Sequence, residues 1–519
     1  MTDTGQSDTS RFGFRGAVTA IFGQWGRVAI QLVALVVLAR ILSPADYGLM
    51  AIVAGIVNVA NLFCDGGLSG AALQASSLSH HQRSNLLWAN LGLGAVLSVA
   101  LGSCATLVGQ IYGDPDLTRL CLLISPVFII NGLAAQYRIA LNRDGRFLAI
   151  SVIDLVGALA GLAIGIACAL RGLGAIALIA QQLTGATVTA GALVIAQPWL
   201  PAWPRRHVGT RPLIRFGGMW LATMLANSVS SSVTPLALGW YQPASVVGSF
   251  NRALQIAQQP TGQLLGPLTR LAVPRAVRVG EDSKARALSL YAVHSPASTV
   301  TSAVLSILVA ASTLAGTVLL GDQWRSIGLI IAILAVSGFV QTAQQISYWL
   351  LFSSGNSRLL FLSEIIPRLV FVLSIIVCAR FGVIPVCVAV VLLQVMILLV
   401  GCLFALPVIG ISRREALARS LSPVAYFLAI SLVILAGKAV LLFGLRIDAL
   451  VVDWLAIAFW SVAVGASAVV SARLRRSWLQ AVRPILSRLP RRPHSARHAP
   501  WPKSPQGIPP TEDPIDPHI

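Results

Sequence analysis

The chain has 519 residues, of which 56% are hydrophobic and only 11% are charged, and its formal net charge is +20. So apolar a composition excludes a soluble globular fold and is typical of a protein with many membrane-spanning helices. The positive charge requires no nucleic-acid partner, because an excess of Lys and Arg in cytoplasmic loops gives the same sign.

Apolar runs about as long as a bilayer is thick follow one another along almost the whole chain, and we expect about fourteen spans. Two runs are the least apolar: residues 213–233 are rich in Asn and Ser, and residues 246–257 are short and contain Arg252. A long cytoplasmic connection is expected over residues 267–294. The clearest runs cover residues 16–38, 47–63, 86–108, 120–136, 424–445 and 450–470.

Two short matches indicate an internal repeat. Residues 11–13 (Arg-Phe-Gly) open the first span much as residues 215–217 (Arg-Phe-Gly) open the seventh, and residues 43–48 (SPADYG) lie roughly where residues 242–248 (QPASVVG) lie in the second half. Because an even number of spans separates the two starts, the halves would share one orientation, as in carriers built from parallel repeats.

These patterns predict an all-α polytopic membrane protein with two pseudo-symmetric six-helix lobes and two C-terminal helices. The Pro-rich and Arg-rich segment between the lobes is the expected hinge, and the tail beyond Ser471 is expected to be disordered. The expected segments are an N-terminal cytoplasmic segment (1–14), an N-lobe (15–197), the hinge loop (198–212), a C-lobe (213–410), two further spans (411–472) and the basic Pro-rich tail (473–519).

The basic residues give the orientation, because short loops that retain Lys and Arg lie on the cytoplasmic side. Most of the 38 Lys and Arg fall in every second gap between spans, which places both termini and the gap with Arg138, Arg143 and Arg146 in the cytoplasm. The first 14 residues lack the apolar core of a secretory signal, so we expect the first span to be retained. The outward side receives Arg40, Arg119, Arg171, Arg325, Arg380 and Arg446.

The sequence contains no motif of a hydrolase, a nucleotide-binding loop or a metal site, so we expect neither catalysis nor a cofactor. The seven Cys are scattered in or at the ends of spans and are expected to pack as small apolar residues. Residues 114–116 (Asp-Pro-Asp) are the tight acidic cluster on the outward side, and we expect them to cap the next helix rather than bind a metal.

Ionisable side chains inside spans are the candidates for function, because each costs roughly 2.5–3.5 kcal/mol to insert. Arg27 lies midway along the first span and is expected to contact a cavity or substrate, although a structural ion pair is the alternative. Arg252 is its possible counterpart in the second half. The full set is Arg27, Asp65, Asp154, Arg252, Glu364, Arg368, Lys438 and Asp453.

The acidic members have open alternatives. Asp65 precedes a Gly-rich run, and gating and the capping of a helix break are equally favoured. Asp154 has no partner on its own helix face and needs one from another helix, with proton coupling as the functional alternative. Glu364 and Arg368 form a self-contained pair at i and i+4, unless Arg368 instead faces a cavity and attracts anions. Lys438 and Asp453 are expected to be a structural pair or end anchors.

Several stretches resemble bacterial polysaccharide-biosynthesis flippases, a family of the multidrug/oligosaccharidyl-lipid/polysaccharide exporter superfamily. The resemblance rests on motifs up to residue 274 and extends to about residue 410. One departure is the segment 227–235 of the seventh span, which is uncharged where the family often has Arg and Asp. The matching stretches are 38–50 (LARILSPADYGLM), 63–68 (FCDGGL), 213–218 (LIRFGG), 248–253 (GSFNRA) and 266–274 (GPLTRLAVP).

The resemblance implies a non-enzymatic flippase of the inner membrane. It would move a polyprenyl-diphosphate-linked oligosaccharide to the outer leaflet by alternating access, for exopolysaccharide, capsule or O-antigen synthesis, with a polysaccharide polymerase and a chain-length regulator as further partners. Arg27, Arg252 and Arg368 would then be headgroup candidates, and Asp65, Asp154 and Glu364 would be gating or coupling candidates.

Three alternatives stay open: a drug or organic-cation exporter of the same superfamily, a membrane polysaccharide polymerase or glycosyltransferase, and a scaffold subunit of a polysaccharide assembly complex. Cation export predicts a net acidic cavity. An enzyme predicts a large outward loop with Arg or acidic catalytic residues, and no such loop is present in the sequence.

Overall fold

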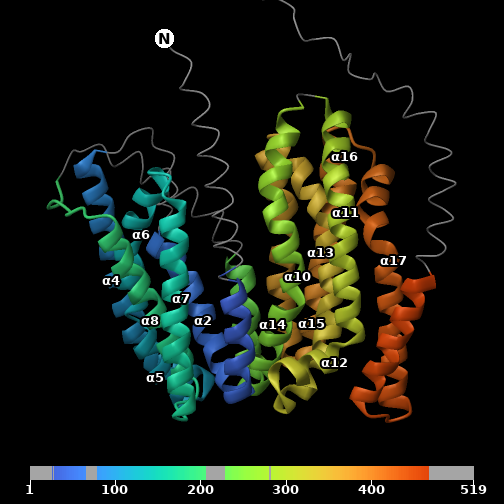
Figure 1. The fold of residues 1–519 in the computed structure, drawn as a ribbon, viewed down its shortest axis with the longest axis horizontal. Helices are drawn as coiled ribbons and strands as arrows, with labels where there is room; N and C mark the ends of the chain where they lie inside the picture. The colour runs from blue at the N-terminus through green and yellow to red at the C-terminus, as the bar shows by residue number, and fades with distance from the viewer. Residues whose placement is uncertain (1–25, 27, 66–78, 206–227, 280–281, 467–519) are drawn as a thin grey trace, which may run out of the picture. The chain divides into compact units, whose positions relative to one another are not determined.

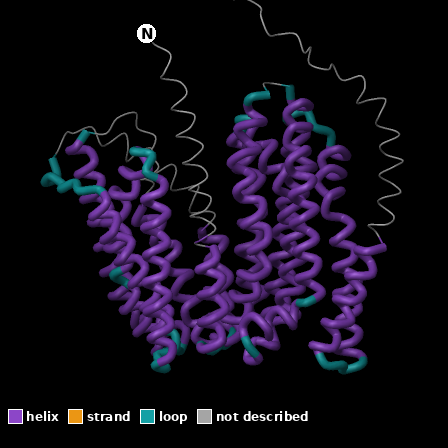
Figure 2. Tube along the Cα trace, viewed as in Figure 1, coloured by secondary structure: helices purple, strands orange, loops and turns teal. Residues whose placement is uncertain are grey.

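A computed structural model describes residues 26, 28–65, 79–205, 228–279 and 282–466. Within these residues the chain forms helices and loops without a strand (Figures 1 and 2). The described residues up to Trp460 belong to one compact unit, and residues 461–466, which are helical, belong to a second. The all-α polytopic class predicted from the sequence is confirmed.

Ten helices of the described part are long and apolar enough to cross a bilayer. The exact number of spans, expected to be about fourteen, stays a prediction. The ten are His80–Tyr112, Pro115–Arg143, Phe147–Leu170, Ile176–Ala196, Ser283–Ala310, Asp322–Ser353, Arg358–Phe381, Val383–Val408, Arg413–Leu442 and Ala449–Ala466.

The first half of the chain, residues 28–197, begins with the helix Val28–Ile41. Its helices start at recognisable caps: the Ser79 side chain accepts from the Gln82 N–H, and the Gln82 side chain accepts from the Ser79 N–H, which forms a capping box. Asp114 likewise accepts from the Asp116 N–H, so the acidic cluster caps a helix as predicted. The labelled helices are α2 (Pro44–Asp65), α4 (His80–Tyr112), α5 (Pro115–Ile124), α6 (Val127–Arg143), α7 (Phe147–Leu170) and α8 (Ile176–Ala196).

The second half, residues 228–410, opens with a helix over residues 228–241. Its labelled elements, with those that follow it to residue 444, are α10 (Ala244–Val277), α11 (Ser283–Ala310), α12 (Ser312–Ala315), η1 (Gly316–Leu320), η2 (Asp322–Ile327), α13 (Gly328–Ser353), α14 (Ser357–Cys378), η3 (Ala379–Phe381), α15 (Val383–Val400), η4 (Gly401–Ala405), α16 (Leu406–Val408), α17 (Arg413–Ala439) and η5 (Val440–Gly444).

Helix α10 corrects two expectations. We expected a short span over residues 246–257 and a long connection over 267–294, but α10 runs unbroken from Ala244 to Val277 and α11 begins at Ser283. Each of the three prolines inside α10 removes one N–H donor. Because Pro260, Pro267 and Pro274 are seven residues apart, intact turns lie between them and hold the helix together.

The two halves meet where α2 and α10 begin, and the contact is reciprocal. A Cβ atom on Gly48 would lie 1.7 Å from the Ala244 carbonyl oxygen, and one on Gly248 would lie 1.9 Å from the Pro44 carbonyl oxygen. Each glycine therefore meets the residue four positions before the other glycine. The second pair of repeat motifs thus occupies equivalent positions in the structure, whereas residues 11–13 and 215–217 lie outside the described residues.

Hydrogen bonds join the same, predicted outward, ends of the halves. The Trp324 indole N–H donates to the Ala39 carbonyl at 2.8 Å, and Tyr112 donates to the Leu236 carbonyl at 3.1 Å. Arg40 donates to the Val318 carbonyl at 2.6 Å. Each of these bonds satisfies a backbone carbonyl oxygen of one half with a side-chain donor from the other half.

The Ser-rich segment of the second half packs against α2. Ser230, Ser232 and Thr234 are buried, and a Cβ on Gly55 of α2 would lie 3.4 Å from the Ser232 carbonyl oxygen. Small residues of this kind let helix backbones approach closely in a membrane. The buried hydroxyl-bearing residues of the described segment 228–234 therefore support close packing of helices.

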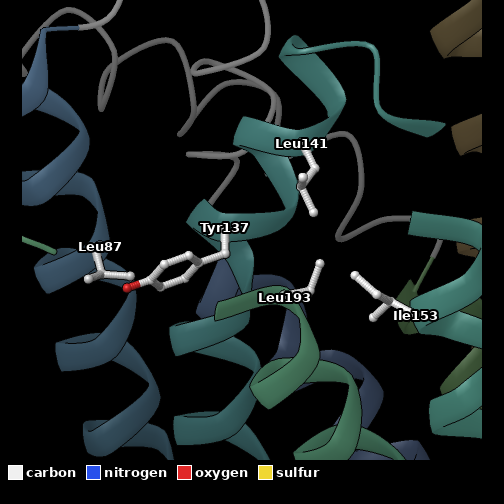
Figure 3. Close-up of a cluster of buried hydrophobic side chains, with 5 residues drawn as sticks. All are labelled: Leu87, Tyr137, Leu141, Ile153 and Leu193. Atoms are coloured by element: carbon white, nitrogen blue, oxygen red, sulfur yellow. The ribbon is translucent and has the colours of Figure 1, made fainter. Parts of the chain in front are cut away.

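A buried apolar cluster closes the predicted cytoplasmic end of the first half (Figure 3). It joins four helices, since its members come from α4, α6, α7 and α8, and the indole-bearing Trp199 packs against it from the following loop. Its members are Leu87, Tyr137, Leu141, Ile153 and Leu193.

Candidate functional site

A cavity of about 870 Å³ lies among the helices of the first half. Its walls come from the helix Val28–Ile41 and from α2, α6, α7 and α8, with one side chain from α10. This volume lies within the range of small-molecule binding sites. The polar residues of its lining are Gln31, Asn61, Asn131, Arg138, Asn142, Asp154, Gln181, Gln182, Thr189 and Arg252.

One wall exists because α7 and α8 approach at glycines. A Cβ on Gly157 would lie 2.1 Å from the Thr189 hydroxyl oxygen, and one on Gly161 would lie 2.5 Å from the Gln181 carbonyl oxygen. A larger residue at Gly161 would meet the backbone of α8, and one at Gly157 would displace the Thr189 side chain. The glycines therefore fix where the amide and hydroxyl groups of α8 stand in the cavity.

Arg138 and Asp154 form a bidentate ion pair in the cavity wall. Arg138 Nη2 lies 2.6 Å from Asp154 Oδ1, and Nη1 lies 3.1 Å from Oδ2. The side chains are 36% and 16% exposed, so the pair is accessible from the cavity. The structure thus supplies, from α6, the partner that Asp154 was predicted to need from another helix.

The position of Arg138 corrects the sequence analysis. We placed Arg138 in a cytoplasmic loop, but α6 continues to Arg143 and turns Arg138 toward the cavity. The sequence contains only a partial signal, since the apolar residues Ile139, Ala140 and Leu141 follow Arg138. In the structure all three are buried. The predicted end of this span at residue 136 was therefore wrong, because a single Arg does not end the helix.

Arg252 is the residue through which α10 reaches this cavity. Its guanidinium carbon lies 3.8 Å from the centre of the Tyr47 ring, and its Nη1 donates to Gln255 Oε1 at 2.6 Å. Its buried Nε has no hydrogen-bond partner within the described part of the chain. A cation–π contact holds the charge without neutralising it. Arg252 is therefore placed to attract an anion.

The described lining of the cavity is net basic. Two arginines, Arg138 and Arg252, face it together with one carboxylate, that of Asp154. The amides around them include Asn61 and Asn131, whose side chains are joined by a hydrogen bond of 3.1 Å. The arrangement can hold an anionic group near the arginines and hydrogen-bond hydroxyl groups through the amides.

Two predicted site residues do not join this cavity. Arg368 pairs with Glu364 on α14, and its Nη1 also donates to the Glu364 carbonyl at 3.1 Å. Neither side chain belongs to the cavity lining. Of the two interpretations we held open, the self-contained pair at i and i+4 is therefore the one that forms.

Arg27 lies outside the described residues, as do the glycines that follow Asp65. Asp65 is the last residue of α2, and its side chain is also outside the described part. The predicted headgroup role of Arg27 and the gating role of Asp65 therefore stay predictions.

Lys438 and Asp453 form the predicted structural pair. Lys438 Nζ lies 2.6 Å from Asp453 Oδ1 and also donates to the Ser312 hydroxyl at 2.8 Å. The second carboxylate oxygen of Asp453 accepts from the Leu314 N–H at 2.7 Å. The two side chains are only 4% and 1% exposed. The pair is sealed, and it fastens α17 and the helix Ala449–Ala466 to α12.

The chain is similar to known proteins in sequence and in fold. A family model described as "Polysaccharide biosynthesis protein" matches residues 37–329. The chain is 24% identical over 392 residues to the lipopolysaccharide biosynthesis protein WzxC of Escherichia coli (strain K12), which covers 75% of this chain and 80% of that protein. It is 23% identical over 338 residues to the teichuronic acid biosynthesis protein TuaB of Bacillus subtilis (strain 168), covering 62% of this chain and 67% of TuaB.

Among solved structures, the fold matches that of the lipid II flippase MurJ in an inward closed conformation. The TM-score is 0.66 at 14% sequence identity, over 89% of this chain and 99% of MurJ. At this identity the likeness concerns the fold alone.

Proposed function

The chain belongs to the polysaccharide biosynthesis protein family, and on that premise we propose that it is a flippase for a lipid-linked oligosaccharide. The substrate is a polyprenyl-diphosphate-linked repeat unit, moved from the cytoplasmic to the outer leaflet for exopolysaccharide, capsule or O-antigen synthesis. The relatives named above act in the biosynthesis of lipopolysaccharide and teichuronic acid, which is the same class of product.

The net basic lining of the 870 Å³ cavity is the observation that carries this proposal. A diphosphate is anionic, and the planar guanidinium groups of Arg138 and Arg252 suit its oxygens. The amides of Gln181, Gln182 and Asn131 are suited to the hydroxyl groups of a sugar. Arg27, which precedes in sequence the helix that contributes Ile30 and Gln31 to the same lining, is a further headgroup candidate.

Transport proceeds by alternating access of an N-lobe (15–197) and a C-lobe (213–410), with the segment 198–212 as the hinge. The reciprocal contact of Gly48 and Gly248 supports this mechanism, because it brings together equivalent points of the two halves at the predicted outward end. Asp154 is the candidate for coupling, since an anion that binds Arg138 competes with the Asp154 carboxylate.

The proposed location is the inner membrane, with both termini in the cytoplasm, as the distribution of Lys and Arg indicates. The product of a flippase is used on the outer side, so a polysaccharide polymerase and a chain-length regulator are the proposed partners. The proposed role of this chain is transport without catalysis.

An organic-cation exporter of the same superfamily is the competing function. Such a carrier needs a net acidic cavity, and the described lining has two arginines against one aspartate. The sign of the cavity therefore favours an anionic substrate.

The proposal is tested in cells that lack the chromosomal copy and express either the wild type or a variant. Arg252→Ala should abolish glycan export, because the cavity loses the arginine that contacts Tyr47 and Gln255 instead of pairing with Asp154. The protein level should stay unchanged. Lipid-linked intermediates are then extracted: complete repeat units should accumulate on the inner leaflet. Full export by both Arg252→Ala and Arg27→Ala would refute headgroup binding, and exported single units would indicate a polymerase instead.

A further inference from the structure

A second and smaller cavity lies at the predicted cytoplasmic end of the first half. Its volume is about 130 Å³, and its lining includes Arg83 of α4, Gln136 and Arg143 of α6, and Gln197, which follows α8. Ile139 lines this cavity and the 870 Å³ cavity. One residue of α6 thus forms a wall between two polar spaces.

Buried polar atoms of this small cavity lack protein partners. Gln136 is 1% exposed, and neither its Nε2 nor its Oε1 has a hydrogen-bond partner within the described ranges. Nε and Nη2 of Arg83 are also buried without a partner there. Polar groups in such positions are ordinarily hydrogen-bonded. Arg83 of α4 and Gln136 of α6 therefore line one cavity with donors that have no hydrogen-bond partner among the described residues.

Arg83 is nevertheless held in place. Its guanidinium carbon lies 3.9 Å from the centre of the Trp199 ring, and the Trp199 indole N–H donates to His80 Nδ1 at 3.0 Å. Tyr137 donates to the Trp199 backbone carbonyl at 3.1 Å, which ties the backbone of Trp199 to the buried cluster of Figure 3. Stacking orients a guanidinium group while its N–H groups stay available. The site is built before a ligand arrives.

The charge and size of the cavity define the ligand. Arg83 and Arg143 line it together with one carboxylate, Asp144, which accepts from Gln197 Nε2 at 3.3 Å. The described lining is therefore net positive. Since a water molecule takes roughly 30 Å³ of liquid, the cavity has room for a group of several heavy atoms. Guanidinium and amide donors around an anion of that size are suited to phosphate.

Nearby tryptophans indicate that the cavity lies at the depth of lipid headgroups. Trp88 and Trp203 stack with ring centres 5.8 Å apart, and the Trp88 indole N–H donates to the Ala202 carbonyl at 3.0 Å. Trp203 is 82% exposed. Tryptophans are enriched at membrane–water interfaces. A phosphate attached to a lipid is therefore within reach of this site.

We propose that the small cavity between α4 and α6 is a second binding site, which takes the phosphate group of a membrane lipid through Arg83 and Gln136. The phosphate comes either from a polyprenyl diphosphate or from an anionic phospholipid headgroup. The site is separate from the 870 Å³ cavity and does not depend on the flippase function.

Binding to the purified full-length protein in detergent tests this site. The probes are farnesyl diphosphate and short-chain phosphatidylglycerol, with farnesol as the control that lacks phosphate. Arg83→Gln and Gln136→Leu should each raise the Kd at least about tenfold, the effect of losing one charge-assisted hydrogen bond. Gln136→Leu keeps the charge and nearly the volume, so it tests the site even if Arg83→Gln does not fold. Size-exclusion chromatography and circular dichroism verify folding.

Two controls separate this site from other effects. Arg146→Gln removes one charge from the same end of the molecule, where Arg146 binds the Ala196 carbonyl outside the cavity, and should leave the Kd within about twofold. All variants are also made in an Arg252→Ala background, so that diphosphate binding in the large cavity does not mask the result.

A loss of binding for both probes supports a general phosphate site. A loss for farnesyl diphosphate alone assigns the site to the polyprenyl carrier, and a loss for phosphatidylglycerol alone assigns it to a phospholipid headgroup. An unchanged Kd in both Arg83→Gln and Gln136→Leu, or an equal loss in Arg146→Gln, would overturn the proposal. Export in cells is measured separately, so failure here leaves the flippase proposal standing.

Discussion

Two ion pairs of this molecule each join an aspartate to a basic side chain and lie in different surroundings. Arg138–Asp154 and Lys438–Asp453 each join an aspartate in one helix to a base in another, and each has an N–O distance of 2.6 Å. The first pair stands in the wall of a polar cavity and is partly exposed, whereas the second is almost completely buried and has two further hydrogen bonds.

The difference separates a pair that can open from one that cannot. An incoming anion can reach Arg138 from the cavity and compete with Asp154, so that Arg138 keeps a counter-charge when the pair separates. Lys438 and Asp453 have no such access, and separating them would leave two charges in a medium of low polarity. The accessible pair is suited to substrate binding, and the sealed pair is suited to holding helices together.

The largest effect is expected at the sealed pair. Lys438→Met should destabilise the protein by about 3–5 kcal/mol, because Asp453 keeps its burial and loses its counter-charge. The measurement is the thermal unfolding midpoint in a fixed detergent. Replacing both members, Lys438→Met with Asp453→Leu, should recover most of the stability. A single variant as stable as the wild type would show that the pair does not hold these helices.

A smaller and different effect is expected at the cavity pair. Arg138→Gln should lower glycan export about tenfold, equivalent to about 1.4 kcal/mol, by weakening the hold on the substrate anion. Arg368→Gln is the matched control, since Arg368 also pairs with a carboxylate but lies outside the cavity lining. Its export should stay within about twofold of wild type. Equal losses in the two variants would remove the distinction between accessible and self-contained pairs.

The smallest effect is expected at an exposed pair between Arg325 and Asp448. The Leu450 backbone N–H and the Arg325 side chain both bind the Asp448 carboxylate and hold its pKa below the ordinary value. A lowered pKa stabilises the folded state above the unfolded pKa of about 3.9, and this contribution disappears as the pH falls through the folded value.

Asp448→Asn should therefore lower the unfolding midpoint slightly at neutral pH, and the difference from wild type should shrink on acidification below about pH 4. Unfolding midpoints measured across a pH series check this. A difference that grows as the pH falls would contradict the assigned direction of the pKa.

Sequence reasoning reached the ion pairs whose partners lie close along a helix or stand alone in neighbouring spans. The Glu364–Arg368 pair follows from a spacing of four residues, and Lys438 with Asp453 follows from two isolated charges in consecutive spans. For Asp154 the need for a partner was predictable, because a lone carboxylate in a span is costly. That the partner is Arg138 was not predictable, because this depends on where α6 ends.

The cavity itself was beyond sequence reasoning. Its amides, among them Asn61, Asn131 and Gln181, come from α2, α6 and α8, and only the packing of these helices brings them together. Neutral amides also give a weak signal within apolar runs. The predicted extent of α10 was also wrong: a connection was expected from Pro267 onward, but the helix continues through Pro267 and Pro274 to Val277.

The contact between Gly48 and Gly248 has a consequence for how such chains diverge. Each glycine faces a backbone oxygen of the other half, so this contact is specified by the absence of side chains and not by their chemistry. The residues that line the cavity stand elsewhere, on α6, α7 and α8 for the most part. Selection for a new cargo can therefore substitute residues of the cavity lining and keep the contact that joins the halves. Substrate preference and the joining of the halves can thus change independently.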